Sequence, residues 1–336
     1  MTGRGMARFA RGCALALALA PCAAAAAAPG FDKRPEVREF IREMVEQHGF
    51  VEQELRFLFA RAKREPAILK AIKPPAVRQA RAWSAYRAIF VNPRHLQAGL
   101  AFWDQNRPAL ERAAAEFGVP EEYVVAIIGV ETFYGRNTGR WRVVDALATL
   151  AFDYPPRAPY FRSELRNYLL FARDMELDVF SVRGSYAGAI GIPQFMPGSY
   201  LRFAVDFDGD GIVDLRANDT DSIGSVANFL KQHGWRPGER VALPARVAGD
   251  AHRPMLEAGI EPKFRLADLR QFGVETRSDL PVDTQVALID LGAPDAPTEY
   301  RLGLRNFYVL TRYNRSSFYA AAVDDLAAAL RAARAK

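Results

Sequence analysis

The chain has 336 residues, of which 50% are hydrophobic, 25% charged and 11% aromatic, and no internal repeat is visible. This composition is that of an ordinary globular protein, and the length allows two or three domains around a large core. The formal net charge is +6, but no short segment is dense in lysine and arginine, so a nucleic-acid partner is not indicated.

The first 28 residues have the pattern of a secretory signal peptide. An apolar segment, residues 13–20, precedes a run of alanines. The basic residues in front of it are Arg4, Arg8 and Arg11. The segment is short for a membrane-spanning anchor and Pro21 interrupts it, so we predict a cleaved leader and an exported, periplasmic protein. Subtracting the three leader arginines from +6 leaves about +3 for the mature chain.

Both cysteines, Cys13 and Cys22, lie in the predicted leader. Its removal would leave no thiol, disulfide or cysteine metal site. The sequence Leu-Ala-Pro-Cys that ends at Cys22 loosely resembles a bacterial lipobox, although Pro21 is a poor match. We favour a soluble exported protein, with an outer-membrane lipoprotein anchored through Cys22 as the alternative.

Residues 31–118 predict a helical segment. An apolar stripe at helical spacing ends at His48-Gly49. Its members are Val37, Phe40, Ile41, Met44 and Val45. Further candidate helices cover residues 52–62, 80–90 and 93–117.

Glu131 closes an almost entirely apolar helix that we expect to start at Pro120. Val124, Ile127 and Ile128 precede it at i−7, i−4 and i−3, so the carboxyl shares their stripe. Burial should raise its pKa and make it a proton donor near neutral pH. The helix can end at Gly135, which would open a loop or cleft beside the acid. A buried glutamate that only organises the core is equally consistent with this helix alone.

Other catalytic patterns are missing from the sequence. The four histidines are scattered, and there is no HExxH, GxSxG or P-loop pattern.

Asp206, Asp208 and Asp210, followed by Gly211, match the start of a calcium loop. The carbonyl of Ile212 is a further candidate ligand. Ala217 stands where the last carboxylate is expected, so Asp219 or Asp221 would have to complete the site, and we select Asp221. We predict a structural calcium ion, with a solvated acidic turn as the alternative.

Residues 185–200 form a glycine-rich stretch, SYAGAIGIPQFMPGSY. Its small residues would let a polymer approach the backbone, and its hydroxyl, amide and aromatic groups suit sugars. Taken alone, the stretch equally fits a tight turn between helices.

The end of the chain changes character. Residues 241–244, 282–291 and 300–313 contain short β-rich runs separated by glycine and proline turns, and residues 307–310 resemble a buried strand. Residues 317–335 are rich in alanine and predict a helix that docks on the N-terminal helices. The predicted class is therefore α+β and predominantly helical.

Six segments resemble, in the same order, the membrane-bound lytic murein transglycosylase B family, glycoside hydrolase family 103. They are GVETFYGR from Gly129, GRWRVVDALATLAF from Gly139, SYAGAIGIPQFMPGSY from Ser185, VDFDGDG from Val205, SIGSVANFLKQHGW from Ser222 and NFYVLTRYNRSSFYAAAV from Asn306. The resemblance implies a lysozyme-like core with an N-terminal helical domain and a small antiparallel β domain.

The resemblance also implies the domain bounds and the reaction. We expect a helical domain at 31–118 joined by 317–335, a core at 119–236 that includes the loop 206–221, and a β domain at 237–316. The family cleaves the β-1,4 bond between N-acetylmuramic acid and N-acetylglucosamine of peptidoglycan and leaves a 1,6-anhydro end. Glu131 matches its single catalytic acid and base.

The substrate-binding residues that the resemblance implies are Ser185, Gln194, Tyr86, Tyr160, Tyr313, Asn314 and Tyr319. In the family the acidic loop can bind calcium, which supports Asp206, Asp208 and Asp210. Expected partners are peptidoglycan strands and wall-synthesis or remodelling proteins, with the protein itself a monomer.

Ile192 and Pro193 depart from the family's usual Tyr-Gly, which puts the fit of one sugar subsite in question. Two other functions remain open. A hydrolytic muramidase would need a second carboxylate about 5–9 Å from Glu131, for which Asp145 and Asp153 are candidates. A non-catalytic peptidoglycan-binding scaffold would have no need of the acid.

Overall fold

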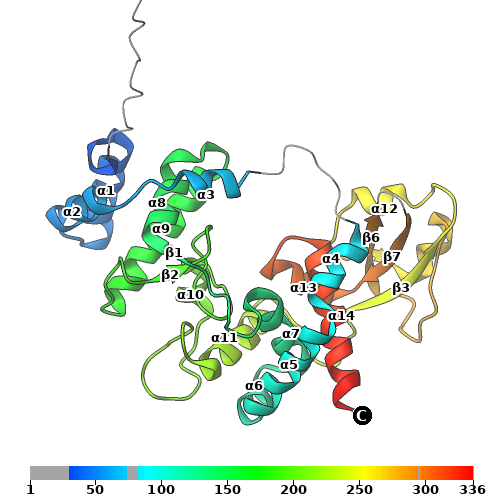
Figure 1. Ribbon diagram of the computed structural model, residues 1–336. Helices are drawn as coiled ribbons and strands as arrows, with labels where there is room; N and C mark the ends of the chain where they lie inside the picture. Colours follow the sequence, from blue (N-terminus) through cyan, green and yellow to red (C-terminus); the bar gives the residue numbers. More distant parts are fainter. Residues whose placement is uncertain (1–29, 74–81, 294–295, 336) are drawn as a thin grey trace, which may run out of the picture.

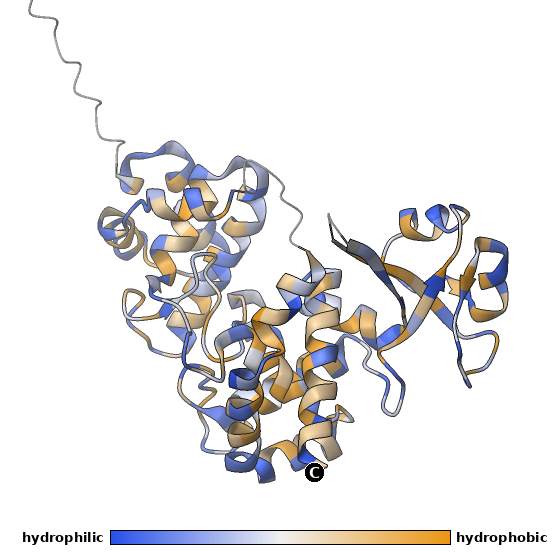
Figure 2. Cartoon of the chain, turned by 45° about the vertical axis from the view of Figure 1, so that its right-hand side comes forward, coloured by the Kyte–Doolittle hydropathy of each residue, from blue (hydrophilic) through white to orange (hydrophobic). Residues whose placement is uncertain are grey.

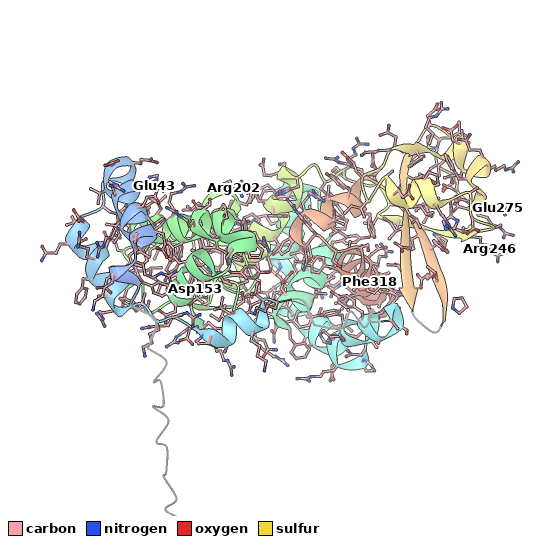
Figure 3. All side chains as sticks on the ribbon, turned by 90° about the horizontal axis from the view of Figure 1, so that it is seen from above. Glu43, Asp153, Arg202, Arg246, Glu275 and Phe318 are labelled. Carbon is pink, nitrogen blue, oxygen red and sulfur yellow. The ribbon has the colours of Figure 1, made fainter. Side chains whose placement is uncertain are left out.

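The computed structural model describes residues 30–73, 82–293 and 296–335. The predicted leader, Cys13 and Cys22 lie outside these residues. The described chain is elongated, with the first helices at one end and a small sheet at the other (Figure 1). Figure 3 shows the same arrangement from above, with Glu43 and Asp153 at one end and Arg246 and Glu275 at the other.

The elements up to Phe117 are helical, as predicted. They are η1 (Phe31–Lys33), α1 (Pro35–His48), α2 (Glu52–Arg61), α3 (Pro66–Ala71), α4 (Trp83–Phe90), α5 (Pro93–Gln105) and α6 (Arg107–Phe117). In α1 the stripe from Val37 to Met44 is buried, and the helix ends at Gly49, whose φ is 69°. The candidate helix at 93–117 divides at Asn106, since Pro108 has no N–H to continue the ladder.

The central part of the chain contains mainly helices connected by irregular loops. Its elements are α7 (Glu121–Thr132), β1 (Trp141–Arg142), α8 (Val143–Asp153), η2 (Pro155–Arg157), α9 (Ala158–Asp174), β2 (Arg183–Gly184), α10 (Pro197–Phe203) and α11 (Asp219–Gln232). The two short strands β1 and β2 pair antiparallel, with Trp141 opposite Gly184.

The sheet comes late in the chain, as predicted. Its elements are β3 (Ala242–Val247), α12 (Arg253–Glu257), β4 (Phe264–Arg265), η3 (Leu266–Phe272), β5 (Val274–Glu275), β6 (Gln285–Ala293) and β7 (Ala296–Gly303). The strands lie in the order β4-β6-β7-β3-β5, and every pair is antiparallel. The sheet has its own apolar cluster, in which Met255, Val274 and Leu302 are fully buried.

The predicted strand at residues 307–310 is wrong, because these residues belong to helix α13 (Arg305–Tyr313). A short apolar run is compatible with either element. Helical spacing places Arg305, Tyr308 and Arg312 on one side, where both guanidinium groups lie over the Tyr308 ring. Phe307 and Leu310 are buried on the other side.

The last helix, α14 (Ser317–Arg334), packs along α7 and also contacts α4, α5 and α13 (Figure 1). Its alanines allow close approach, and Tyr123 of α7 donates a hydrogen bond of 2.9 Å to Asp324. Hydrophobic residues dominate α14 and the helices around it (Figure 2). The C-terminal helix therefore closes the core beside the helix that carries Glu131.

Across residues 30–73, 82–293 and 296–335, no helix combines the length and the apolar character needed to cross a membrane.

Gly139 offers a test of how tightly the loop after α7 is packed. Its φ is 102°, and a Cβ there would overlap the backbone of Gly184 in β2. We expect Gly139→Ala to lower the free energy of unfolding by about 3 kcal/mol or more, through strain and overlap together. Gly259 has a φ of 80° with nothing within 4 Å of a Cβ, so Gly259→Ala should cost only about 1 kcal/mol. Urea unfolding curves measure both, and equal losses would contradict the packing at Gly139.

Candidate active site

Glu131 lies in the last turn of α7, as predicted, but the helix ends at Thr132 rather than at Gly135. Phe133 and Tyr134 turn the chain with positive φ values of 52° and 59°. Such values cost non-glycine residues roughly 1–3 kcal/mol each and persist only where the surroundings hold them. Tyr134 is held by its hydroxyl, which donates to the carbonyl of His95 at 3.1 Å.

Thr132 joins the end of α7 to the glycine-rich loop. Its buried hydroxyl donates to the carbonyl of Ile192 at 2.8 Å and accepts the N–H of Gly135 at 2.9 Å. The residue next to Glu131 therefore fixes both the turn and the neighbouring loop.

The carboxyl of Glu131 has one hydrogen-bond partner among the described side chains. The hydroxyl of Tyr319, in α14, donates to Glu131 Oε1 at 2.7 Å. Burial raises the pKa of Glu131 from 4.5 to about 7, and the Tyr319 hydrogen bond opposes part of that rise. Glu131 is thus substantially protonated near neutral pH, with its second oxygen free to face a ligand.

The ring of Tyr313 packs against the ring of Tyr319. The two rings stack with centroids 6.3 Å apart and planes 15° apart. The Tyr313 hydroxyl donates to the carbonyl of Pro193 at 2.6 Å. Burial raises the pKa of both tyrosines well above 10, and the charge of Glu131 adds to this. Both phenols therefore remain hydrogen-bond donors at any working pH.

The glycine-rich loop reaches the same site. Gln194 has a φ of 53°, and its amide nitrogen donates to the carbonyls of Thr138 and Gly191 at 3.0 and 2.9 Å. Ser185 Oγ accepts the N–H groups of Ala187 and Ala189, so it shapes the turn. The side chain of Gln194 thus ties this loop to the one that follows α7.

Ile192 and Pro193, the two departures from the family pattern, are both packed inside. Ile192 is only 4% exposed, and its carbonyl accepts the Thr132 hydrogen bond. The carbonyl of Pro193 holds Tyr313. These residues act through their backbone and their packing, and Ile192 presents no side chain to a ligand.

A row of aromatic rings leads from α4 to the turn after α7. Neighbouring rings lie 4.8 to 6.4 Å apart. In order they are Trp83, Tyr86, Phe90, His95 and Phe133. The last three line a hollow of about 220 Å³ that also contains Glu131. The partly exposed rings, Tyr86, Phe90 and His95, are suited to the CH faces of sugars, while Trp83 and Phe133 are buried beneath them.

Tyr86 and Phe318 link this row to Tyr319. The rings of Tyr86 and Phe318 are 5.7 Å apart, and the phenol of Tyr86 acts electrostatically on Tyr319. Figure 3 places Phe318 in the middle of the molecule.

Two predicted ligand residues make no described contact with the Glu131 group. Tyr160 is 38% exposed and lies beside Arg157, whose guanidinium carbon is 4.4 Å from its ring centroid. Asn314 is exposed between α13 and α14, and its carbonyl accepts the N–H of Ser316.

The acidic loop brings Asp206, Asp208 and Asp210 together, with one oxygen from each within 4.8 Å of the others. Asp221 instead holds the two ends of the loop. Its oxygens accept the N–H groups of Phe207 and Asp214 at 2.7 and 2.8 Å. The donor set is that of a hard cation, since it consists of carboxylate oxygens alone.

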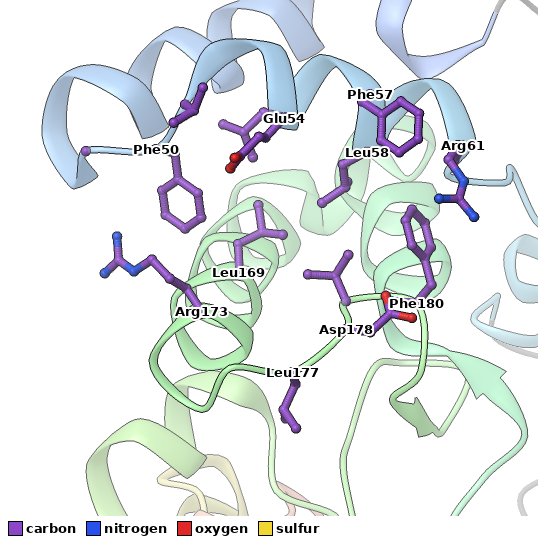
Figure 4. Close-up of a pocket in the computed structure, with 14 residues that line it drawn as sticks. Phe50, Glu54, Phe57, Leu58, Arg61, Leu169, Arg173, Leu177, Asp178 and Phe180 are labelled. Atoms are coloured by element: carbon purple, nitrogen blue, oxygen red, sulfur yellow. The ribbon is translucent and has the colours of Figure 1, made fainter.

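The apolar hollow between α2 and the end of α9 contains none of the predicted site residues (Figure 4). Its volume is about 590 Å³, and Phe50, Leu58, Leu169 and Phe180 line it. It lies apart from Glu131 and supplies no acid to the reaction site.

The two other candidate carboxylates are engaged elsewhere. Asp145 accepts hydrogen bonds from Arg142 at 2.6 Å and from the N–H of Lys63 at 2.9 Å. Asp153 pairs with Arg34 and Arg64. Neither carboxylate contributes to the pKa of Glu131.

Comparison with known proteins places this geometry in a family. The transglycosylase SLT domain matches residues 32–328, and the chain belongs to this family. It is 43% identical over 315 residues to the membrane-bound lytic murein transglycosylase B of Escherichia coli strain K12, covering 90% of this chain and 85% of that protein.

Solved structures agree with this assignment. Soluble lytic transglycosylase SltB1 from Pseudomonas aeruginosa is 47% identical with a TM-score of 0.83, over 90% of this chain and all of that one. Escherichia coli Slt35 in complex with calcium is 42% identical with a TM-score of 0.81, over 90% and 95%. SltB3 from Pseudomonas aeruginosa with NAG-NAM-pentapeptide is 29% identical with a TM-score of 0.76, over 90% and 80%. The fold is therefore the lysozyme-like fold of lytic transglycosylases.

Several residues around Glu131 were missed by the sequence interpretation. Thr132, Phe133, His95 and Asn137 line the hollow, and none was selected. Thr132 and Phe133 directly follow Glu131 in the sequence, so their hydroxyl and ring could have been selected from it. His95 belongs to another helix, and its place at the site depends on tertiary packing.

Substitution of Tyr319 tests the control of the Glu131 pKa. We expect Tyr319→Phe to remove the hydrogen bond that lowers this pKa, so the pKa rises. Glu131 then stays protonated to higher pH, and the alkaline limb of the pH–rate profile for peptidoglycan turnover moves upward. Tyr308→Phe removes the hydroxyl of a partly buried tyrosine in α13 and serves as the control. An unchanged or downward-shifted limb in Tyr319→Phe would contradict the assignment.

Proposed function

We propose that the protein is an exported lytic transglycosylase that cleaves the β-1,4 bond between N-acetylmuramic acid and N-acetylglucosamine in peptidoglycan. The observation that carries this proposal is one glutamic acid, about half protonated near pH 7, that accepts a hydrogen bond from a tyrosine and lines a hollow with aromatic rings. The family membership and the relatives named lytic murein transglycosylases support it.

In the proposed reaction Glu131 first acts as an acid. Its proton passes to the glycosidic oxygen as the bond from that oxygen to C1 of muramic acid breaks. Tyr319 remains on Oε1 and stabilises the carboxylate that forms. The substrate's own N-acetyl group would stabilise the positive charge that develops at C1.

Glu131 then acts as a base. The carboxylate removes the proton from the C6 hydroxyl of the same sugar, and the C6 oxygen bonds to C1. The product is a 1,6-anhydro end, and Glu131 returns to its neutral form. No water is consumed, so no second carboxylate is required. The engagement of Asp145 and Asp153 with arginines supports this mechanism over hydrolysis.

Digestion of purified sacculi followed by mass spectrometry tests the reaction. We expect anhydro-ended muropeptides from the wild-type protein and a fall of at least about 1,000-fold with Glu131→Gln, which cannot transfer the proton. Glu122→Gln, on the same helix but paired with Arg331, is the matched control and should stay active.

Reducing ends in place of anhydro ends would instead identify a muramidase that uses water. Binding of wild-type protein to sacculi without any product would identify a non-catalytic scaffold. Either result would refute the proposed reaction.

We also propose the domain division 31–118 with 317–335, 119–236, and 237–316, and export to the periplasm as a soluble monomer. The separate apolar cluster of the sheet supports the last domain. The contacts of α14 with α4 and α5 support the first.

The acidic loop is proposed to bind a structural calcium ion through Asp206, Asp208, Asp210 and the carbonyl of Ile212. The calcium complex of Slt35 supports this proposal. Asp221 would act by holding the loop ends, and the ion would neutralise three neighbouring carboxylates.

Calcium titration during thermal unfolding tests the ion. Because the folded state alone offers the site, calcium at about 100 times Kd should stabilise it by roughly 2.7 kcal/mol and raise Tm. We expect Asp208→Ala to abolish the rise and Asp250→Ala, which alters an exposed aspartate outside the loop, to preserve it. An identical rise in the Asp208→Ala protein would exclude the loop as the site.

A further inference from the structure

The hollow beside Glu131 has a cationic rim that the reaction described above does not use. Arg94 lines the hollow, and its guanidinium carbon lies 4.6 Å from the centroid of the Phe133 ring. Arg136 lies over the same ring at 5.1 Å. We call Arg94, Phe133 and Arg136 the arginine clasp.

Neither arginine of the clasp is neutralised. Both side chains are exposed, and neither has a hydrogen bond or ion pair with any side chain in the described parts of the chain. Many other arginines of the protein do pair with acids, for example Arg142 with Asp145 and Arg301 with Asp325. Two guanidinium groups thus each lie within about 5 Å of the centre of one ring, with their N–H donors available.

The clasp does not serve to ionise Glu131. Neither arginine contributes to the pKa of Glu131, which burial sets. Burial lowers the pKa of His95, and the charge of Arg94 lowers it further, so both favour the neutral imidazole ring. Among the described residues Glu131 is the one carboxyl that lines the hollow, and its pKa of about 7 leaves it about half protonated near neutral pH. The rim therefore carries net positive charge and suits an anionic group.

Phe133 positions the two arginines, because both guanidinium groups lie over its ring. It is 7% exposed, sits at the positive-φ turn and packs against His95 with centroids 4.8 Å apart. The row of rings from Trp83 ends at this residue. A saccharide stacked on the partly exposed rings of the row, Tyr86, Phe90 and His95, would bring its substituents to the two arginines beside Glu131.

We propose that the arginine clasp binds a carboxylate carried by the lactyl arm of N-acetylmuramic acid, and so selects which muramic acid is placed beside Glu131. This inference rests on the proposed function. The carboxylate has two sources, the peptide attached to the lactyl group or, where the peptide has been removed, the lactyl group itself. Guanidinium groups are suited to both because they donate paired N–H bonds to carboxylates.

Binding measurements with Glu131→Gln protein, in which the ligand is not consumed, test the proposal. Three tetrasaccharide probes are compared: GlcNAc–MurNAc repeats with pentapeptides, the same repeats with free lactyl carboxylates, and GlcNAc alone. Arg94→Gln and Arg136→Gln should each weaken binding of a carboxylate-bearing probe about threefold, and the pair together about tenfold. Binding of the GlcNAc probe should not change.

Arg61→Gln is the matched control. Arg61 also lies over phenyl rings, those of Phe57 and Phe180, and has no ion pair with the residues that the structure describes, but it lines the hollow between α2 and α9 (Figure 4). It should leave all three affinities unchanged. The loss caused by the clasp substitutions should shrink at high salt, since exposed charges are screened.

The pattern across the probes decides between outcomes. A loss confined to the pentapeptide probe assigns the carboxylate to the peptide, and a loss confined to the free lactyl probe assigns it to the lactyl group. Equal loss for the GlcNAc probe, or no loss for any probe, would overturn the proposal. Digestion of sacculi is scored separately: anhydro products without a clasp effect refute this inference alone, and a clasp effect without anhydro products refutes the proposed reaction alone.

Discussion

The hydrogen bond from Tyr319 to Glu131 is the interaction on which the site depends. It joins α7 to α14. The hydrogen bond lowers the pKa of Glu131 while burial raises it, and the balance leaves this pKa at about 7. Burial alone would favour a permanently neutral acid, and strong charge pairing would give a permanent carboxylate. One neutral donor gives neither extreme, so the same group can lose a proton and regain it. The stacking of Tyr313, its bond to Pro193 and the fit of Thr132 against Ile192 all hold that geometry.

Sequence patterns predicted the regular parts of this architecture. The stripe in α1, the apolar α7 with Glu131 at its end, the alanine-rich α14 and the late sheet follow from periodicity and turn residues. The run Phe307–Leu310 was misassigned because four apolar residues do not define a period, and the neighbouring arginines that settle the helix had been left out of the pattern. The end of α7 was misplaced because glycine is the usual residue for a positive φ. Here Phe133 and Tyr134 adopt it, held by tertiary contacts that no local pattern contains.

The same limit applies to the site. Glu131 could be selected from its own helix, and the family resemblance added Tyr319 and Gln194. The partners of these residues could not be read locally. His95 reaches the hollow from α5. The amide nitrogen of Gln194 donates a hydrogen bond to the carbonyl of Thr138, 56 positions away. Asp221 is a predicted ion ligand, and its position in the sequence does not reveal that its two oxygens also accept backbone N–H groups at both ends of the loop. Sequence identifies reactive groups, while the packing of distant segments decides what each group does.

The position of α14 has a consequence for when the protein can act. The donor to Glu131 lies 188 positions after it, beyond the whole of the sheet, in the last helix of the chain. A polypeptide that is still being made, or that has lost α14, has α7 but no Tyr319 to hold the acid. Cutting a load-bearing polymer is hazardous to a cell when it begins in the wrong place. A site assembled from α7 and α14 becomes complete only after both helices have been made and have packed together.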